Sequence, residues 1–298
     1  MITGLAFVAL AAIWGSSFLF IRIAAPEFGA ILSAELRVAI AWACLWLISI
    51  FTLGPSRCFQ RPRFEPRLLA LGLINSAIPF ALYGAASLYL SAGYLAILNA
   101  LVPLWGGLIA SVWLGQPFRW SLVMAVLIAA TGITMLVNLG PAEANIQTVL
   151  GGVACAGATF CYALAAQCTR RWFAEASPLH VARSTLGYAT LALLPFSIPD
   201  IAVATPSAAG WFSIFMLGML GSGLAYLLYF WLLRELGAVR ASSVTFLIPG
   251  FGLIWGAIFL DEVITLTVLA GLGLVVLSSL LVQRSAAPVL PKANASSP

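Results

Sequence analysis

The feature that most constrains the fold of this chain is a series of ten long apolar runs separated by short polar segments. Spanning the ~30 Å hydrocarbon core of a bilayer takes about 20 apolar residues in a helix. A helix also satisfies its own backbone hydrogen bonds in lipid, where water cannot. The runs therefore predict an all-α integral membrane protein with ten transmembrane helices. They lie near residues 3–23, 31–52, 68–90, 93–114, 119–138, 148–168, 178–197, 210–233, 240–260 and 265–283.

The composition supports a membrane protein and excludes a soluble one. Only 8% of the residues are charged and 62% are hydrophobic, whereas soluble domains average about 25% charged residues. The runs do not alternate as the ~10-residue strands of a membrane β-barrel do. The first run is too long for a cleavable signal peptide and lacks the basic start of one, so we interpret it as a retained helix.

The basic residues of the loops gather on one side of the predicted bundle, and this bias sets its orientation. Only Arg22 and Arg37 fall on the other side, where the acidic residues cluster. Both termini are therefore expected to be cytoplasmic, in the cytoplasmic (inner) membrane of a bacterium. The net charge of +5 reflects this topology and does not indicate nucleic-acid binding. The basic residues on the predicted cytoplasmic side are Arg57, Arg61, Arg63, Arg67, Arg119, Arg170, Arg171, Arg183, Arg234, Arg240, Arg284 and Lys292.

The two halves of the chain resemble each other and are predicted to have opposite orientations. Each half holds five helices, and this odd number inverts the second half relative to the first. Residues match at offsets of 146 or 148 positions: Pro103 with Pro249, Gly106 with Gly252, Gln116 with Glu262, Gly4 with Gly152 and Trp14 with Tyr162. We expect a first five-helix repeat at 1–140, a second at 146–284 and a disordered cytoplasmic tail at 285–298.

Inverted repeats characterise many secondary transporters, in which the substrate site lies near the membrane midplane at the repeat interface. An inverted pair offers two equivalent gates, which is what alternating access needs. The alternative explanation is a gene duplication kept for folding reasons alone.

Several motifs resemble those of a known family. They are Trp14-Gly15-Ser16-Ser17-Phe18, Arg37 near the start of the second helix, and the mid-helix prolines Pro103 and Pro249. Over about residues 3–283 the chain resembles the drug/metabolite transporter superfamily, in its ten-helix EamA-type branch, and within it the YddG-type aromatic amino-acid exporters. The resemblance implies a basket of helices whose central cavity is formed by the first, third, fourth, sixth, eighth and ninth helices. Gln116 stands where the family often has glutamate, so a carboxylate is not required there.

Aromatic and polar side chains of these helices are candidates to hold a substrate. In the eighth helix, a stripe with helical spacing offers flat rings and hydroxyls to an aromatic or amphipathic solute, although it would also serve as a packing face. The stripe comprises Trp211, Phe215, Gly218, Ser222, Tyr226 and Tyr229. In the third helix, Asn75 shares a face with Pro79, Leu82 and Ala86. Asn75 either contacts the substrate or forms an interhelical hydrogen bond, and Tyr83 is expected at the cavity edge.

The first and sixth helices are equivalent in the two halves and offer opposed aromatic groups that would clamp a flat solute. Trp14 shares a face with Ser17, and Tyr162 shares one with Thr159. In the fourth and ninth helices, each proline frees the carbonyl group four residues before it, which makes a hinge, a ligand acceptor or a static kink. The predicted substrate-binding residues are Trp14, Ser17, Asn75, Tyr83, Asn99, Trp105, Tyr162, Ser222, Tyr226, Tyr229 and Thr245, and the predicted hinges are Pro103 and Pro249.

The charged residues are predicted to stay out of the cavity. Glu35, Asp261 and Glu262 sit at helix ends, and His180, the only histidine, begins the seventh helix. Arg37 and Glu35 are expected to pair with neighbours or to extend to the interface. Because ion-driven transporters often carry acids within their helices, this pattern favours facilitated diffusion over obligate proton antiport.

A cavity with aromatic faces, amides and hydroxyls but little net charge favours export of an aromatic or other neutral amino acid by alternating access. The runner-up is export of another metabolite or a drug-like cation with proton coupling, and an ion channel would need rings of charge or carbonyl filters. Gly221-Ser222-Gly223 resembles a nucleophilic serine motif, but His180 lies near a membrane surface, too far to act as its base. We therefore predict no enzyme, metal or cofactor, and expect a monomer or weak dimer whose partners are the solute and the bilayer.

Overall fold

The structure is a computed structural model that describes residues 2–54, 64–113, 115, 120–139 and 145–285. All regular secondary structure in these residues is helical, and the helices group into ten rods in the predicted order. The predicted tail at 285–298 lies almost wholly outside the described residues, and so does Gln116.

Five rods form the first half of the chain. The first and second are α1, Ile2–Phe28, and α2, Ala30–Leu53. The third consists of α4, Pro66–Gly72, a π-helical segment η1, Leu73–Ala77, and α5, Ile78–Ser87. The fourth consists of α6, Ala92–Asn99, and α7, Val102–Trp113, and the fifth is α8, Trp120–Leu139.

The second half repeats this order. The sixth and seventh rods are α9, Ile146–Trp172, and α10, Pro178–Ile201. The eighth consists of α11, Ala208–Phe215, a π-helical segment η2, Met216–Leu224, and α12, Ala225–Leu236. The ninth consists of α13, Ala238–Ser242, a 3₁₀ segment η3, Ser243–Phe246, and α14, Ile248–Leu260, and the tenth is α15, Leu266–Ser285.

Most of these rods are long and apolar enough to cross a membrane. Seven meet both requirements, and within α8 and α15 the stretches Trp120–Leu136 and Leu266–Val282 are shorter apolar helices. The remaining rod, α10, has 24 residues and carries Arg183 and Asp200 towards its two ends. The prediction of an all-α membrane protein is confirmed.

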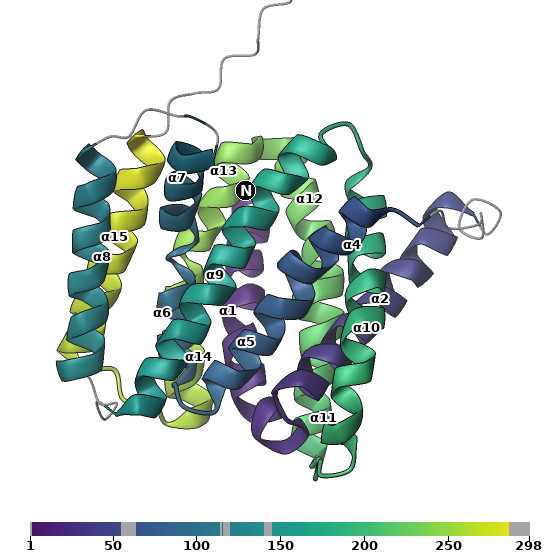
Figure 1. The fold of residues 1–298 in the computed structure, drawn as a ribbon, viewed down its shortest axis with the longest axis horizontal. Helices are drawn as coiled ribbons and strands as arrows, with labels where there is room; N and C mark the ends of the chain where they lie inside the picture. Colours follow the sequence, from purple (N-terminus) through teal and green to yellow (C-terminus); the bar gives the residue numbers. More distant parts are fainter. Residues whose placement is uncertain (1, 55–63, 114, 116–119, 140–144, 286–298) are drawn as a thin grey trace, which may run out of the picture.

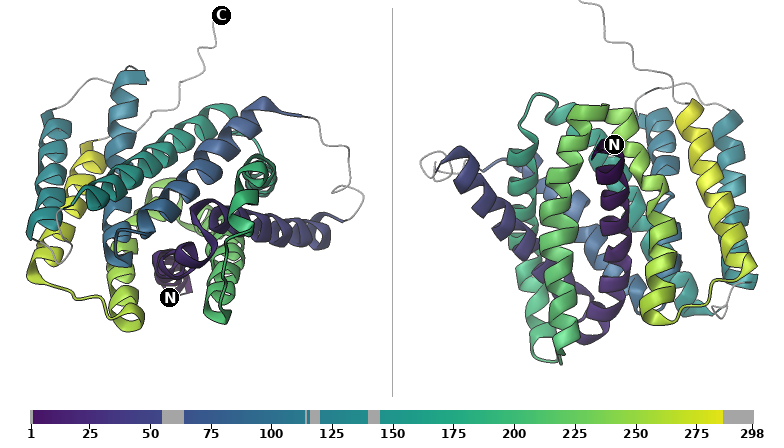
Figure 2. Two further views of the ribbon diagram at one scale, coloured as in Figure 1. Left: turned by 60° about the horizontal axis from the view of Figure 1, so that its bottom comes forward. Right: turned by 180° about the vertical axis from the view of Figure 1, so that it is seen from behind.

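The two halves interlock and do not form two separate bundles (Figure 1). The fifth and tenth rods, α8 and α15, pack along each other at one edge, and the second and seventh, α2 and α10, do so at the opposite edge. Between these pairs, α1 packs against α14 of the other half, and α9 packs against α5 and α7. Two views from other directions show the same pairing (Figure 2). Rods at corresponding positions in the two halves therefore make corresponding contacts.

We call the end of the bundle where α1 begins the near end, and the end where α1 finishes the far end. The near end is uppermost in Figure 1, and α15 also finishes there. At the far end, α14 stops at Leu260 and Asp261 adopts a left-handed conformation, with φ of 53°. The chain then turns so that the Glu262 carboxylate accepts hydrogen bonds from the backbone N–H groups of Ala92, at 2.6 Å, and Gly93, at 2.9 Å. Glu262 thus caps N–H groups at the start of α6 that have no partner within that helix, across the boundary between the halves.

The fourth and ninth rods are interrupted at the predicted prolines. Pro103 is the second residue of α7, which begins after a break at Ala100 and Leu101. Pro249 is the second residue of α14, which follows the 3₁₀ segment η3. Proline fits the first turn of a helix because the N–H group it lacks has no partner there. Each predicted kink is therefore a full restart of the helix.

The rods α1, α6 and α14 approach closely where glycine leaves no side chain between them. A Cβ atom added at Gly15 of α1 would lie 2.6 Å from the Cβ atom of Phe251, and one at Gly252 of α14 would overlap the Cβ atom of Ala96. Real Cβ atoms essentially never come so close. These contacts bring the middle of the two halves together.

The Gly252→Ala substitution should lower the free energy of unfolding by about 1–3 kcal/mol, because the added methyl group overpacks the contact with α6. The measurement is thermal unfolding of the purified protein in detergent, followed by tryptophan fluorescence. Gly250→Ala is the matched control, since no atom lies within 4 Å of its added Cβ atom. Equal melting temperatures for the two variants would contradict the close approach.

Candidate functional site: a central cavity between the two halves

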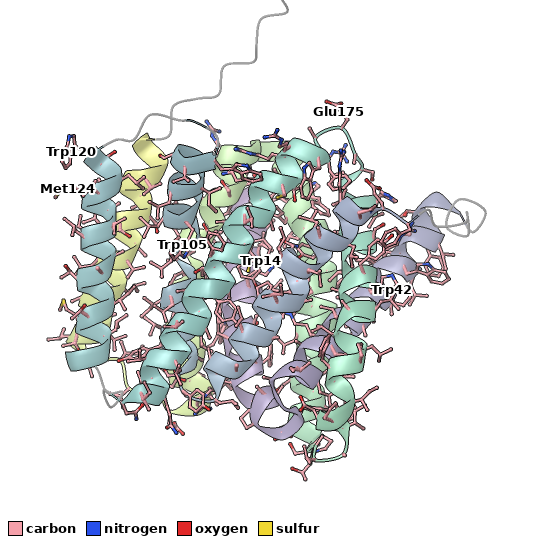
Figure 3. All side chains as sticks on the ribbon, in the orientation of Figure 1. Trp14, Trp42, Trp105, Trp120, Met124 and Glu175 are labelled. Carbon is pink, nitrogen blue, oxygen red and sulfur yellow. The ribbon has the colours of Figure 1, made fainter. Side chains whose placement is uncertain are left out.

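A cavity of about 230 Å³ lies where the two halves meet. Its walls come from the first, third, fourth, sixth, eighth and ninth rods, as the family resemblance implies, and also from the second. The lining residues are Trp14, Ser17, Phe18, Ile21, Arg37, Asn75, Phe80, Tyr83, Asn99, Val102, Tyr162, Gly221, Ser222, Tyr226, Thr245 and Ile248. Trp14 lies about midway between the two ends of the bundle (Figure 3).

The structure brings nearly all the predicted site residues together around this cavity. Trp14, Ser17, Asn75, Tyr83, Asn99, Tyr162, Ser222, Tyr226 and Thr245 all line it. Trp105 and Tyr229 do not. Sequence reasoning missed several lining residues, of which Arg37 and Phe80 matter most for the chemistry of the cavity.

Trp105 and Tyr229 have other partners. The indole Nε1 of Trp105 donates a hydrogen bond to the Thr159 hydroxyl, at 3.1 Å, and its ring meets the Phe160 ring edge-on at 5.6 Å. Trp105 therefore fastens α7 to α9. The Tyr229 ring packs behind Trp14, with ring centroids 5.3 Å apart, so it supports the cavity wall from outside.

The π-helical segments explain why the predicted stripes fail in part. A π turn bonds residue i to i+5, which shifts the residues after it around the helix axis. In the third rod, the residues that follow Asn75 into the cavity are Phe80 and Tyr83, not Pro79 and Leu82. In the eighth rod, Ser222 and Tyr226 line the cavity, whereas Trp211 and Phe215, before or at the start of η2, are 51% and 49% exposed.

Aromatic rings form a continuous wall on one side of the cavity. The Tyr83 ring stacks on the Tyr162 ring, with centroids 6.1 Å apart and planes at 22°. Phe18 meets Tyr83 edge-on at 5.5 Å, and Phe80 meets Tyr162 edge-on at 6.4 Å. Tyr162 thus stacks with residues of the third rod, while its repeat equivalent Trp14 packs on Tyr229. The two residues of the predicted clamp share the cavity but contact different neighbours.

Each carboxamide of the cavity lies beside a tyrosine hydroxyl. The Tyr83 hydroxyl donates to Oδ1 of Asn99 at 3.0 Å, and the side chain of Asn75 lies close enough to the Tyr226 hydroxyl to interact with it. Asn99 ends α6 at the break before Pro103, and Asn75 lies within η1. Each amide keeps further hydrogen-bonding groups for a solute.

Arg37 pairs with neighbours, which is one of the two outcomes expected for it, but it does so inside the cavity. The prediction that charged side chains stay out of the cavity was therefore wrong. Arg37 is 9% exposed, and its Nε donates to the Ser222 hydroxyl at 2.9 Å. Its Cζ stands 3.8 Å from the centroid of the Phe80 ring, a cation–π contact. The phenols of Tyr162 and Tyr226 are close enough to interact with its charge. An arginine two turns inside a membrane helix is a functional candidate by default, and this signal was present in the sequence.

Glu35 also differs from the prediction, because it is buried in the second turn of α2 and does not lie at an interface. It is 5% exposed, and its Oε2 atom has no hydrogen-bond partner. Glu35 does not line the central cavity, since the side of α2 that carries it is not the side that carries Arg37. The premise that the helices contain no buried carboxylate is therefore wrong.

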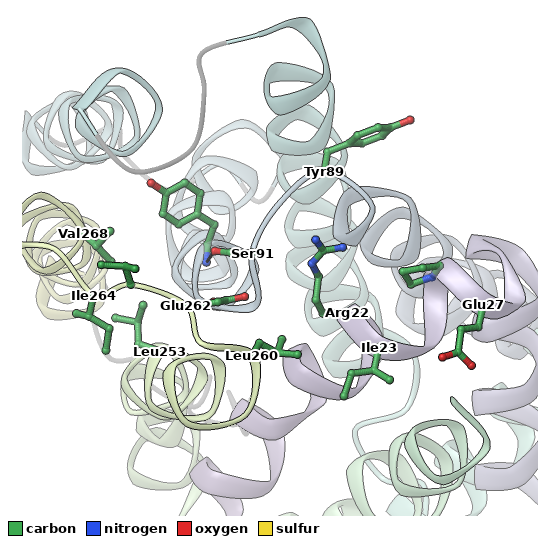
Figure 4. Close-up of a pocket in the computed structure, with 13 residues that line it drawn as sticks. Arg22, Ile23, Glu27, Tyr89, Ser91, Leu253, Leu260, Glu262, Ile264 and Val268 are labelled. Carbon is green, nitrogen blue, oxygen red and sulfur yellow. Dashed lines mark hydrogen bonds between the residues drawn. The ribbon is translucent and has the colours of Figure 1, made fainter. Parts of the chain in front are cut away.

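A second, larger pocket of about 660 Å³ opens at the far end (Figure 4). Arg22 and Glu262 both line it, together with Tyr89 and Ser91. The Arg22 Nη1 donates to the carbonyl oxygen of Ser87 at 2.8 Å. This pocket lies between the end of α1, the start of α6 and the end of α14, outside the ring of residues that lines the central cavity.

The surroundings of Ser222 do not resemble a nucleophile's. Its hydroxyl accepts a hydrogen bond from Arg37, whereas a nucleophilic serine needs a base. His180 is the third residue of α10, at the near end. Among the described residues, no three His, Cys, Asp or Glu side chains gather as they would to hold a metal ion.

Comparisons with known proteins agree on the class. The profile of the EamA-like transporter family matches residues 1–138 and 149–284. An uncharacterised transporter of Archaeoglobus fulgidus is 26% identical over 91% of this chain and 95% of its own length. A probable terminal-alkyne amino-acid exporter of Streptantibioticus cattleyicolor is 24% identical over 91% of this chain and 90% of its own. One crystal structure shares the fold with a TM-score of 0.62 and 17% identity, over 94% of this chain and 95% of the other.

The Trp105→Phe substitution should lower the free energy of unfolding by about 0.5–1.5 kcal/mol, the net contribution of one hydrogen bond. It removes the indole N–H but keeps an aromatic ring against Phe160. Thermal unfolding in detergent measures the change. Trp211→Phe is the control, because that indole is half exposed. If Trp105→Phe were no more destabilising than Trp211→Phe, the hydrogen bond to Thr159 would not contribute to stability.

Proposed function

The chain belongs to the EamA-like transporter family, and from that premise we propose that it exports neutral amino acids, aromatic ones above all, from the cytoplasm. A small-molecule substrate follows from the family. The finer choice of an aromatic amino acid is carried by one observation: the cavity at the junction of the two halves combines a wall of stacked rings with amide and hydroxyl groups.

The size and surface of the cavity support a small, flat solute. Its volume of about 230 Å³ is below the roughly 300–1,000 Å³ of pockets that hold drug-sized ligands. The Tyr83 and Tyr162 rings offer a flat apolar surface, and aromatic pairs are worth about 0.5–1.5 kcal/mol beyond the area that they bury. Asn75, Asn99 and Thr245 offer neutral partners to the polar end of an amino acid.

The relative from Streptantibioticus cattleyicolor supports the amino-acid class, because its name is that of a probable amino-acid exporter. A drug-like cation, the runner-up substrate, has less support. A cation site favours acidic lining or dense aromatic lining. The cavity has the aromatic rings, but no acid is among the described lining residues, and the one formally charged side chain there is the cationic Arg37.

Alternating access is the mechanism that we propose, with residues 1–140 and 146–284 as inverted repeats and the breaks at Pro103 and Pro249 as matched hinges. Both breaks border the cavity, through Asn99 and Thr245. Glu35 is a buried acid, but it lies outside the cavity lining, so we keep facilitated diffusion as the proposal. The distribution of basic residues supports cytoplasmic termini in a bacterial inner membrane.

The test is release from liposomes that contain the purified protein and are loaded with tryptophan, threonine or putrescine. We expect tryptophan to leave fastest, putrescine to be retained, and release to be the same with and without a proton gradient. Putrescine release without tryptophan release would overturn the amino-acid assignment. Tryptophan release that depends on the gradient would replace facilitated diffusion by proton coupling.

The Tyr226→Ala substitution should reduce tryptophan release at least tenfold, because it removes an aromatic ring and a hydroxyl group from the cavity wall. Phe215→Ala in the same rod should leave release within twofold of the wild type, since that ring is half exposed on the outside of the bundle. Initial rates of release at equal amounts of reconstituted protein measure both. Equal rates for the two variants would move the substrate site elsewhere.

A further inference from the structure

We propose that the Arg37 guanidinium binds the carboxylate of the solute, so that the central cavity selects solutes by their carboxylate and excludes amines that lack one. This inference rests on the proposed function, because it names the group by which the same cavity recognises an amino acid. If the carboxylate is the group recognised, the ammonium group of the amino acid is dispensable for binding.

The first support is the position of Arg37 in α2. This rod packs against α10 through Ala34, Val38, Ala41 and Leu45, and it reaches the cavity through Arg37. On this side the rod meets η2, where a Cβ atom added at Gly218 would lie 3.0 Å from the Arg37 carbonyl oxygen. A charged side chain at membrane depth is costly and points to a pathway or a ligand.

The second support is the way the guanidinium is held. The Ser222 hydroxyl accepts a hydrogen bond from Nε–H, and the Phe80 ring covers one face of the guanidinium. No other hydrogen bond of this guanidinium is made within the described part of the chain. Nη1 and Nη2, with four N–H groups, are therefore left for a ligand. Their fork matches the two oxygens of a carboxylate, so the side chain is oriented before the solute arrives.

The third support is the charge balance of the cavity. Neither aspartate nor glutamate is among the described lining residues, so the positive charge of Arg37 has no counter-ion there. Glu35 is two residues away along α2 and faces another direction. A buried charge is strongly unfavourable until an opposite charge pairs with it. A solute carboxylate supplies that charge, whereas the ammonium group of an amine would add a second positive charge.

The ammonium group of an amino acid finds neutral partners only. Oδ1 of Asn99 already accepts a hydrogen bond from Tyr83, and the other polar side chains of the lining, such as Thr245, carry no charge. Hydrogen bonds of this kind add less than a paired charge. The carboxylate is therefore the group whose removal should cost most affinity.

Three ligands that share a phenyl ring test the inference on the full-length wild-type protein in detergent, by calorimetric titration. They are phenylalanine, 3-phenylpropionate, which lacks the ammonium group, and phenethylamine, which lacks the carboxylate. We expect 3-phenylpropionate to bind within tenfold of phenylalanine, and phenethylamine to bind on the order of a hundredfold more weakly. Phenethylamine binding as tightly as phenylalanine would overturn the inference while leaving an aromatic site in place.

Variants of Arg37 give an independent test. Arg37→Gln should weaken phenylalanine binding about a hundredfold and leave phenethylamine binding unchanged or tighter. Arg37→Lys keeps the charge but loses the fork, and should weaken phenylalanine binding about tenfold. Arg171→Gln, at an exposed arginine, is the control.

The outcomes separate the inference from the proposed function. Unchanged phenylalanine binding in both Arg37 variants would overturn the role of Arg37 while the amino-acid exporter stands. Failure of the wild type to bind any of the three ligands would overturn both. If Arg37→Gln does not fold, the ligand series on the wild type and the Arg37→Lys variant still decide the question.

Discussion

The bilayer's demand that every backbone polar group find a partner inside the protein governs this structure. It turns each apolar run into a helix and makes any departure from regular helix costly unless it is buried in protein or lines a cavity. The departures here are the π-helical segments η1 and η2 and the interruptions near Pro103 and Pro249. Each contributes one polar side chain to the cavity: Asn75, Ser222, Asn99 and Thr245. The irregular segments of the rods thus lie where polar side chains line the cavity.

These departures come in equivalent pairs, in the third and eighth rods and in the fourth and ninth. The same pairing appears in the packing, where α1 lies on α14 and α9 lies on α7. The main buried cluster mixes Leu95 and Ile97 of the first half with Leu253 and Val275 of the second. Because the halves share one core, the close packing of each half depends on side chains of the other.

Sequence reasoning reached the rods, their order and most of the cavity, because membrane helices and prolines leave strong local signals. Trp14 and Tyr162 were found through the repeat, and both line the cavity. The failures have physical causes. A spacing of 3.6 residues per turn placed Pro79 on the cavity face, where the structure has Phe80. The π turn before them shifts the face by one residue, and the sequence pattern does not reveal such a turn. Trp105 was predicted to line the cavity because the sequence does not reveal its hydrogen-bond partner. That partner, Thr159, lies in another rod far along the chain. The positions of Arg37 and Glu35 depend on which rods cover α2, which only tertiary structure determines.

The Glu262 carboxylate has a consequence for any separation of α14 from α6 at the far end. Its two oxygens accept hydrogen bonds from the first two N–H groups of α6. A residue of the second half thus caps a helix of the first. Separation of α14 from α6 would leave the carboxylate and two backbone N–H groups without hydrogen-bond partners at the same time. Water would have to replace these hydrogen bonds if α14 and α6 separated, and the pocket of about 660 Å³ that Glu262 lines opens beside them.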